Sequence, residues 1–156
     1  FFKQTRSGLN NNIFRCIKFR SMTSNINADI KLATKNDPRV TKIGAFMRKT
    51  SIDELPQFIN VFLGQMSVVG PRPHMVSQTQ LYSKVVKKYM TRHMVKPGIT
   101  GWAQVMGSRG EIFSDKDMER RVEKDIWYIQ NWSFFLDLKI IFLTLYNIFK
   151  GDKQAY

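Results

Sequence analysis

The chain has 156 residues and a formal net charge of +13, with 25 Lys and Arg against 12 Asp and Glu. Its 43% hydrophobic content excludes a disordered chain and favours one domain with a buried core. So basic a balance favours an anionic partner, which could be a nucleic acid, an anionic membrane surface or a phosphorylated small substrate. The single cysteine, Cys16, excludes an internal disulfide and lacks zinc-site spacing, so we expect a small buried side chain. With only two histidines, a histidine metal cluster is not expected.

The first half of the chain predicts a short strand followed by helices. Alternating aromatic and β-branched residues predict a strand over 13–20, after a hairpin-type turn over 8–12. The polar segment 23–36 predicts a loop or short helix. Periodic apolar residues predict a helix over 39–47, and a further apolar helix over 57–62 that Gly64 ends.

The second half predicts three longer helices. A basic amphipathic helix is expected over 78–94, then a turn and short strand over 97–102. A charged helix with one apolar stripe follows over 115–131, and a helix dense in Phe, Leu and Ile over 134–149. No apolar run reaches the ~18–20 residues that span a bilayer. We therefore expect an α/β domain, compact and helix-rich, with a small sheet or hairpin and interfacial amphipathic helices.

Two adjacent carboxylates, Asp53 and Glu54, stand at a predicted helix start in this cationic chain. One interpretation is structural. Ser51 and Glu54 have the spacing of a capping box, and the helix dipole would stabilise the negative charge of Asp53 in the first turn. Pro56 fits that interpretation poorly, because it would lie one residue too deep in a helix capped by Ser51.

The other interpretation is chemical, because a carboxylate can attack phosphorus and hold a covalent phospho-enzyme. Bringing each unit charge of a phosphate to about 4 Å costs about 4 kcal/mol at an effective dielectric near 20. Mg²⁺ could offset part of that cost, held by Glu54 and the substrate phosphates. The candidate cations are Arg48, Lys49, Arg72 and Arg109.

Arg72 lies between Pro71 and Pro73, which restrict the backbone and offer no amide donors. Such a turn can present the guanidinium fork in one orientation to a phosphate, although a solvated surface turn would have the same sequence. Arg109 lies between Gly107-Ser108 and Gly110 and is a weaker candidate for the same role.

Five motifs in order along nearly the whole chain resemble the bacterial sugar transferases, which are monotopic polyprenol-phosphate phosphoglycosyltransferases. Each motif is weak alone, but the ordered series is highly specific. The motifs are Lys18-Phe19-Arg20-Ser21-Met22, Asp37-Pro38-Arg39, Ser51-Ile52-Asp53-Glu54-Leu55-Pro56-Gln57, Gly70-Pro71-Arg72-Pro73 and Lys96-Pro97-Gly98-Ile99-Thr100-Gly101-Trp102-Ala103-Gln104-Val105.

The resemblance implies that a sugar 1-phosphate passes from a UDP-sugar to a polyprenol phosphate, such as undecaprenyl phosphate, with release of UMP. It implies that Asp53 is the nucleophile of a covalent phosphosugar intermediate and that Glu54 binds Mg²⁺. Arg48, Arg72 and Arg109 would bind phosphate, and the turn from Pro71 to Pro73 would shape the nucleotide site.

The resemblance also implies a place in the cell and in metabolism. The family starts surface glycan assembly, such as exopolysaccharide, lipopolysaccharide or capsule, at the cytoplasmic face of the bacterial inner membrane. Its members usually carry a membrane-inserting helix upstream of the pattern seen here over 2–8. We therefore expect residues 1–156 to be the catalytic domain of a longer protein from which that helix is missing.

Two segments could contact an anionic membrane. The segment 134–149 predicts either a buried core helix or an interfacial helix, with Trp127 and Trp132 suited to the boundary. Basic residues over 84–92 could contribute about 1 kcal/mol each at an anionic leaflet.

Two other functions remain open from the sequence. A nucleic-acid-binding module would use the basic charge and stack bases on Phe14, Phe19, Tyr82 and Tyr89, but these aromatics form no recognisable RNA-binding motif and no nucleic acid is expected. A membrane-bound scaffold with a vestigial site is the other alternative.

Overall fold

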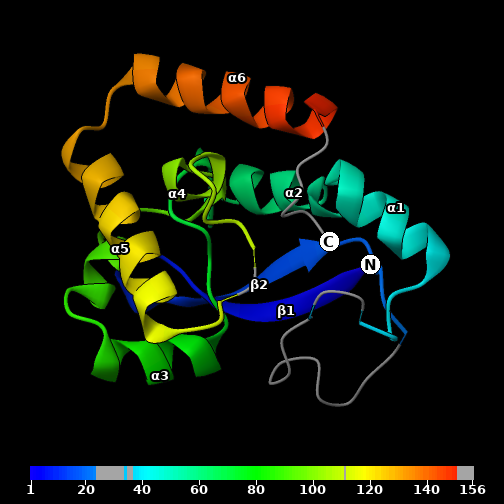
Figure 1. Ribbon diagram of the computed structural model, residues 1–156, viewed down its shortest axis with the longest axis horizontal. Helices are drawn as coiled ribbons and strands as arrows, with labels where there is room; N and C mark the ends of the chain where they lie inside the picture. The colour runs from blue at the N-terminus through cyan, green and yellow to red at the C-terminus, as the bar shows by residue number, and fades with distance from the viewer. Residues whose placement is uncertain (24–33, 35–36, 111, 151–156) are drawn as a thin grey trace.

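The computed structural model of the chain describes residues 1–23, 34, 37–110 and 112–150 (Figure 1). Strands β1 (Phe2–Ser7) and β2 (Ile13–Lys18) form an antiparallel hairpin, and β3 (Ser67–Val69) pairs in parallel with β4 (Gly98–Thr100). The α-helices are α1 (Lys42–Thr50), α2 (Gln57–Phe62), α3 (Val76–Val85), α4 (Trp102–Val105), α5 (Asp115–Gln130) and α6 (Phe134–Lys150). The 3-10 helices are η1 (Leu9–Asn11), η2 (Ile52–Glu54) and η3 (Tyr89–Met94).

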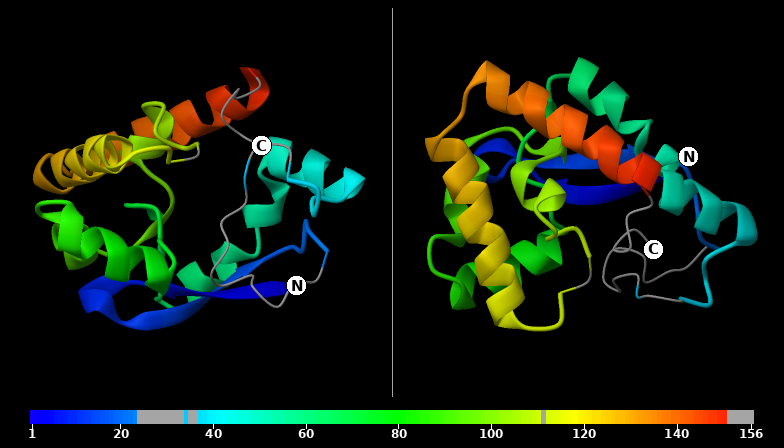
Figure 2. Two further views of the ribbon diagram at one scale, coloured as in Figure 1. Left: turned by 60° about the horizontal axis from the view of Figure 1, so that its bottom comes forward. Right: turned by 45° about the horizontal axis from the view of Figure 1, so that its top comes forward.

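The hairpin lies between two helical sides of the molecule. Figure 1 shows α6 along one side and α3 on the opposite side, with α5 running from near α3 towards α6. The two further views in Figure 2 keep α6 and α3 apart. This helix-rich α/β domain with two small two-stranded sheets confirms the predicted fold class.

Several elements match the sequence-based expectations closely. The predicted strand is β2, and its turn over 8–12 closes the hairpin with Phe2 opposite Lys18. Both α2 and α5 lie where apolar periodicity placed them, and Gly64 follows α2 with a φ of 73°. Cys16 is buried with Phe14 and Met66, as expected for a small apolar side chain. The helix predicted over 39–47 is α1, shifted three residues because Thr41 caps it through Gly44 N.

The helix predicted over 78–94 is wrong. Helix α3 ends at Val85, the backbone is extended at Val86, and Lys88 adopts a left-handed φ of 58° before η3 begins. Amphipathic spacing continued through this break because Val86 and Tyr89 both enter the core beside Met118. The polar segment 23–36 falls almost wholly outside the described residues.

Two glycines allow β4 to approach the turn after β3. A Cβ on Gly98 would lie 2.1 Å from the backbone N of Gly70, closer than side chains tolerate. The backbone bonds from Gly98 N to Pro71 O (2.9 Å) and from Gly70 N to Thr100 O (2.9 Å) depend on that approach. The sheet therefore fixes the chain on which Arg72 lies.

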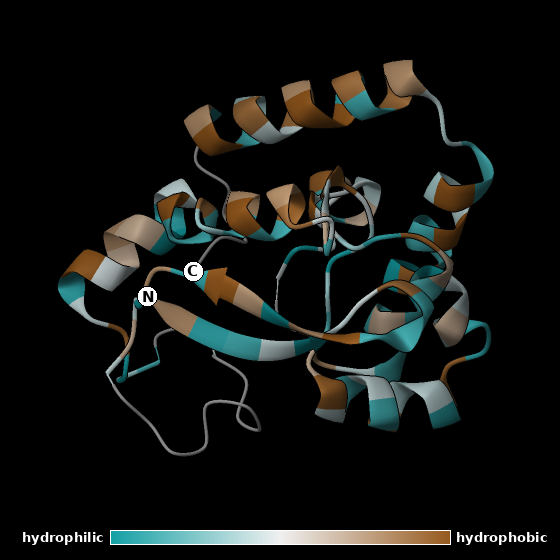
Figure 3. Ribbon diagram, turned by 180° about the vertical axis from the view of Figure 1, so that it is seen from behind, coloured by the Kyte–Doolittle hydropathy of each residue, from teal (hydrophilic) through white to brown (hydrophobic). Residues whose placement is uncertain are grey.

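Helix α6 packs on one face only, because Ile140 is its single buried residue. Its outward face carries exposed Phe134, Phe135, Phe142 and Phe149, so the fully buried core-helix interpretation is wrong. Figure 3 shows that hydrophobic residues predominate along α6. None of the helices that the structure describes has both the length and the apolar character to cross a membrane.

The base-stacking interpretation loses two of its four aromatics. Tyr89 is 1% exposed and Phe14 is 8% exposed, and both belong to core clusters. Stacking on single-stranded nucleic acid needs an exposed ring face. These two side chains are structural, which contradicts their predicted role in a nucleic-acid-binding module.

Candidate active site

The Asp53–Glu54 pair lies in η2, between the end of α1 and the start of α2. The sequence analysis had placed the pair at the start of a single helix. Helix α1 ends where Ser51 takes a left-handed φ of 59°, and α2 begins directly after Pro56. Proline therefore precedes the helix and removes no helical hydrogen bond. The predicted capping box is wrong, because Ser51 makes no capping bond and its Oγ accepts from Arg109 Nη2 at 2.7 Å.

Glu54 is buried and held by two cations. Its Oε1 accepts from Lys18 Nζ at 2.8 Å and from Arg72 Nη2 at 2.7 Å, and its Oε2 accepts from Arg72 Nη1 at 3.3 Å. Burial by itself would raise the pKa of Glu54, but the charges of Arg72 and Lys18 outweigh it and hold that pKa well below the usual value. Glu54 is therefore fixed as an ionised carboxylate.

Asp53 has a different environment although it is the next residue. Its backbone carbonyl accepts from Phe19 N at 2.9 Å, whereas its carboxylate has no hydrogen-bond or ion-pair partner among the described residues. Burial raises the pKa of Asp53, opposed by the charge of Lys18. The Glu54 carboxylate is thus held in ion pairs, while the neighbouring Asp53 carboxylate keeps its lone pairs unused among the described residues.

The turn from Pro71 to Pro73 is held at each of its three carbonyls. Pro71 O accepts from Gly98 N at 2.9 Å, Arg72 O from Arg92 Nη2 at 2.8 Å and Pro73 O from Arg6 Nη1 at 3.3 Å. The two prolines restrict φ, and these bonds restrain the remaining freedom of the turn. The predicted rigid presentation of Arg72 is therefore what the fold builds, and its guanidinium faces Glu54.

Arg92 lies behind this turn and is itself buried. It is 2% exposed, and its Nη2 and Nε donate to Asp125 Oδ2 at 2.8 and 3.1 Å. The pair links η3, α5 and the Arg72 turn. Arg92 therefore supplies no surface charge to a membrane, contrary to the prediction for the basic residues over 84–92.

The other predicted cations reach the pair unequally. Arg109 contacts Ser51, and its charge contributes to the lowered pKa of Glu54. Arg48 lies close enough to Asp53 to oppose the rise in its pKa, with its Nε donating to Ser21 Oγ at 2.9 Å. Lys49 is exposed on α1.

Lys18 is the site cation that residue-by-residue reasoning missed. The only signal for it was its place in the first of the five motifs, since its contact with Glu54 joins residues 36 positions apart.

The residues present fit Mg²⁺ as a site shared with substrate. Among the described residues there is no group of three or more His, Cys, Asp or Glu side chains able to hold a metal. Mg²⁺ commonly takes one or two carboxylates, with phosphate oxygens and waters completing its octahedron. Oε2 of Glu54, whose one bond among the described residues is the 3.3 Å bond to Arg72, is the carboxylate oxygen suited to it.

Comparison with known proteins shows which family the chain resembles. The family model for the bacterial sugar transferases matches residues 1–151. The UDP-glucose:undecaprenyl-phosphate glucose-1-phosphate transferases of Klebsiella pneumoniae and Escherichia coli (strain K12) are 56% and 54% identical, over 99% of this chain and 33% of theirs. The uncharacterized sugar transferase EpsL of Bacillus subtilis (strain 168) is 48% identical, over 97% of this chain and 71% of its own.

The chain spans about a third of the length of the first two relatives. The family match, by contrast, covers almost every residue, including the Asp53–Glu54 pair and the Arg72 turn. This chain belongs to the bacterial sugar transferase family.

Proposed function

We propose that this chain is a catalytic domain that transfers a sugar 1-phosphate from a UDP-sugar to undecaprenyl phosphate or a similar polyprenol phosphate. The names of its relatives support the donor and acceptor classes. The observation that carries the proposal is the pairing of an unoccupied buried carboxylate, Asp53, with the doubly held carboxylate of Glu54.

In the first step, a carboxylate oxygen of Asp53 attacks the phosphorus that bears the sugar. The O–P bond forms as the bond from that phosphorus to the bridging oxygen breaks, and UMP leaves with the electron pair. In the second step, a phosphate oxygen of the polyprenol phosphate attacks the same phosphorus and regenerates Asp53. The raised pKa of Asp53 makes its ionised form a stronger nucleophile.

The cations around the pair offset the repulsion between a carboxylate and a diphosphate. Arg72 and Lys18 neutralise Glu54, so that the substrate meets a net positive site. Arg109, which contacts Ser51, and Arg48, which contacts Ser21, would bind phosphate oxygens. Pro71 and Pro73 keep the Arg72 fork in place for the nucleotide.

Mg²⁺, when bound by Glu54 and the diphosphate, would neutralise charge on the phosphate oxygens. Glu54 contributes the carboxylate ligand, and the surrounding cations position the substrate.

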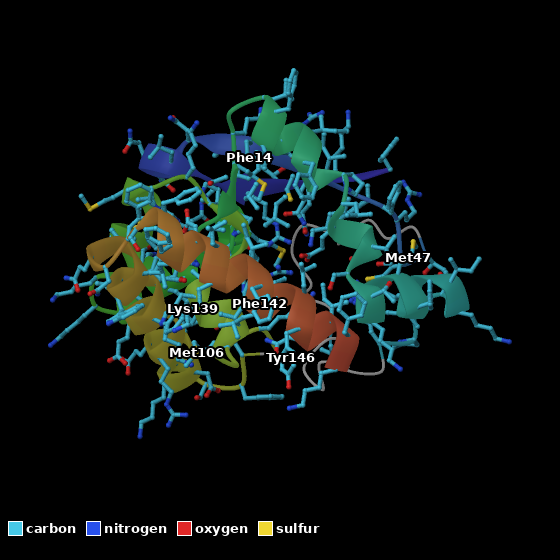
Figure 4. The ribbon with its side chains drawn as sticks, turned by 90° about the horizontal axis from the view of Figure 1, so that it is seen from above. Phe14, Met47, Met106, Lys139, Phe142 and Tyr146 are labelled. Carbon is cyan, nitrogen blue, oxygen red and sulfur yellow. The ribbon has the colours of Figure 1, made fainter. Side chains whose placement is uncertain are left out.

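We further propose that the face formed by α6, α2 and α1 docks on an anionic membrane at the cytoplasmic side of the inner membrane. Viewed from above, Figure 4 shows these helices on one face, with Phe142 and Tyr146 on α6 and Met47 on α1. Burial of such side chains at a headgroup boundary contributes roughly 25 cal/mol per Å². The exposed apolar residues on the face formed by α6, α2 and α1 include Ile43, Phe46, Phe58, Phe62, Phe135, Phe142 and Phe149.

The basic side chains near α3 would then face away from the lipid. Lys84, Lys87 and Lys88 belong to or follow α3, which lies on the side opposite α6 (Figure 1). A flat membrane cannot contact both sides at once. The apolar side chains of α6 make its face the one that docks.

The direct test is Asp53→Asn with UDP-glucose and undecaprenyl phosphate as probes, and UDP-N-acetylgalactosamine as a second donor. Loss of the nucleophile should lower UMP release by about 10⁴-fold or more. Without acceptor, intact mass spectrometry of the wild-type chain should show a sugar-phosphate adduct that maps to Asp53. Asp115→Asn, the same change at an exposed position on α5, should turn over normally. Normal UMP release from Asp53→Asn would refute the assignment.

Arg72→Ala and metal removal test the electrostatic part of the proposal. Loss of the fork should lower kcat/KM by about 10²-fold, as removal of one charge-stabilising donor commonly does. Chelation with EDTA should stop UMP release, and added Mg²⁺ should restore it. Turnover that is insensitive to EDTA would exclude the metal role of Glu54.

A further inference from the structure

The loop that carries Arg109 is bonded to two helices, α4 and α5. It runs from Met106 to Gly110 after the single turn of α4, and Gly107 adopts a φ of 81°. Its backbone is hydrogen-bonded to α4, with Gly107 N donating to Gln104 O (3.2 Å) and Ser108 N donating to Ala103 O (2.8 Å). These bonds fix the start of the loop.

Two cations of α5 hold both ends of the same loop. Lys124 Nζ donates to Met106 O and to Ser108 Oγ, each at 2.8 Å. Arg121 Nη2 donates to Gly110 O at 2.8 Å, on the other side of Arg109. Residues three apart share one face of a helix, so Arg121 and Lys124 act together as a two-point clamp.

The clamp sets where Arg109 can reach. With the loop held, Arg109 Nη2 lies 2.7 Å from Ser51 Oγ, two residues before Asp53. Ser51 occupies the left-handed turn between α1 and η2, so the contact joins the loop to the start of the carboxylate segment. Without the bonds from α5, the guanidinium would sample positions away from η2.

We propose that Arg121 and Lys124 are positioning residues that hold Arg109 beside the Asp53–Glu54 pair before substrate binds. The role rests on the proposed sugar-phosphate transfer, because it assumes that Arg109 binds phosphate during that reaction. Small displacements of a charge from the reacting group can cost about 10²-fold in rate, so a loosened clamp should be visible in the kinetics.

Lys124 is the residue to change, because it is only half buried and its loss leaves the core intact. Lys124→Met should lower kcat/KM for UDP-glucose by about 10-fold. Lys124→Arg keeps donors for Met106 O and Ser108 Oγ and should restore most of that loss. Lys116→Met, the same change on the exposed side of α5, is the matched control and should behave as wild type.

A double-mutant cycle shows whether Lys124 acts through Arg109. In an Arg109→Ala background, Lys124→Met should cause no further loss, since the group that it positions is already gone. Equal losses in both backgrounds, or a Lys124→Met chain as active as wild type, would overturn the proposal while leaving the proposed transfer intact.

Amide hydrogen exchange tests the clamp independently of turnover. Lys124→Met should speed exchange at Gly107 and Ser108, whereas Lys116→Met should not. Should the wild-type chain release no UMP, the proposed function fails and the exchange rates still decide whether the clamp exists. Unchanged exchange at both amides would overturn it.

Discussion

The buried pair of Arg92 and Asp125 should be the costliest single site to break. Both side chains are 2% exposed, and Arg92 holds Asp125 through two donors and Arg72 O through a third bond. Arg92→Met leaves the Asp125 carboxylate buried without its counterion. Removal of one partner from such a pair costs about 3–5 kcal/mol. Since small domains are stable by only about 5–15 kcal/mol, the loss is a large share of the total.

Urea denaturation followed by circular dichroism at pH 7 measures this effect. Arg92→Met/Asp125→Leu removes both charges, and replacing a buried ion pair by apolar groups is often close to neutral, so the double variant should recover most of the loss. Arg120→Met, an exposed arginine of the same helix, should shift the free energy of unfolding by less than about 0.5 kcal/mol.

The deficit should also depend on pH. Burial already raises the pKa of Asp125 beside Arg92, and loss of that charge raises it further. The folded variant then binds the Asp125 proton more tightly than the unfolded chain, so its stability falls as pH rises through the folded pKa. As the pH is lowered from 8 to 5, the stability difference between the Arg92→Met variant and the wild type should therefore shrink. A single variant within about 1 kcal/mol of wild type at pH 7, or a double variant no more stable than the single, would refute the reasoning.

Three further outcomes are expected. The acid limb of the kcat profile should report Asp53 and lie above the usual aspartate range, because burial raises the pKa of that carboxyl; an acid limb at the ordinary value would exclude a buried nucleophile. Gly98→Ala should lower the free energy of unfolding by about 1–3 kcal/mol, since its Cβ would meet the backbone of Gly70, and a neutral result in thermal melts would contradict that contact. Phe142→Glu should weaken cosedimentation with vesicles containing anionic lipid, whereas Phe113→Glu, at an exposed position before α5 begins, should not; equal effects would argue against docking through α6.

Local signals were enough to locate most elements and the Asp53–Glu54 pair. Apolar periodicity found α2, α5 and α6, because each helix buries one stripe of its own residues. The ordered motifs pointed to the family and to Asp53 and Glu54. The helix over 78–94 failed because the spacing of its apolar residues says nothing of the left-handed turn at Lys88.

The chemistry of the pair was decided by tertiary structure. Charge and spacing alone do not distinguish the adjacent carboxylates of Asp53 and Glu54, and only the family resemblance implied different roles for them. Folding brings Lys18, 36 residues away, and Arg72, 18 residues away, onto Glu54, while the Asp53 carboxylate is buried with no partner among the described residues. The amino-acid order thus determined which acids stand together. Only long-range packing, through the positions it gives to distant charges, decided which carboxylate is held in ion pairs and which is not.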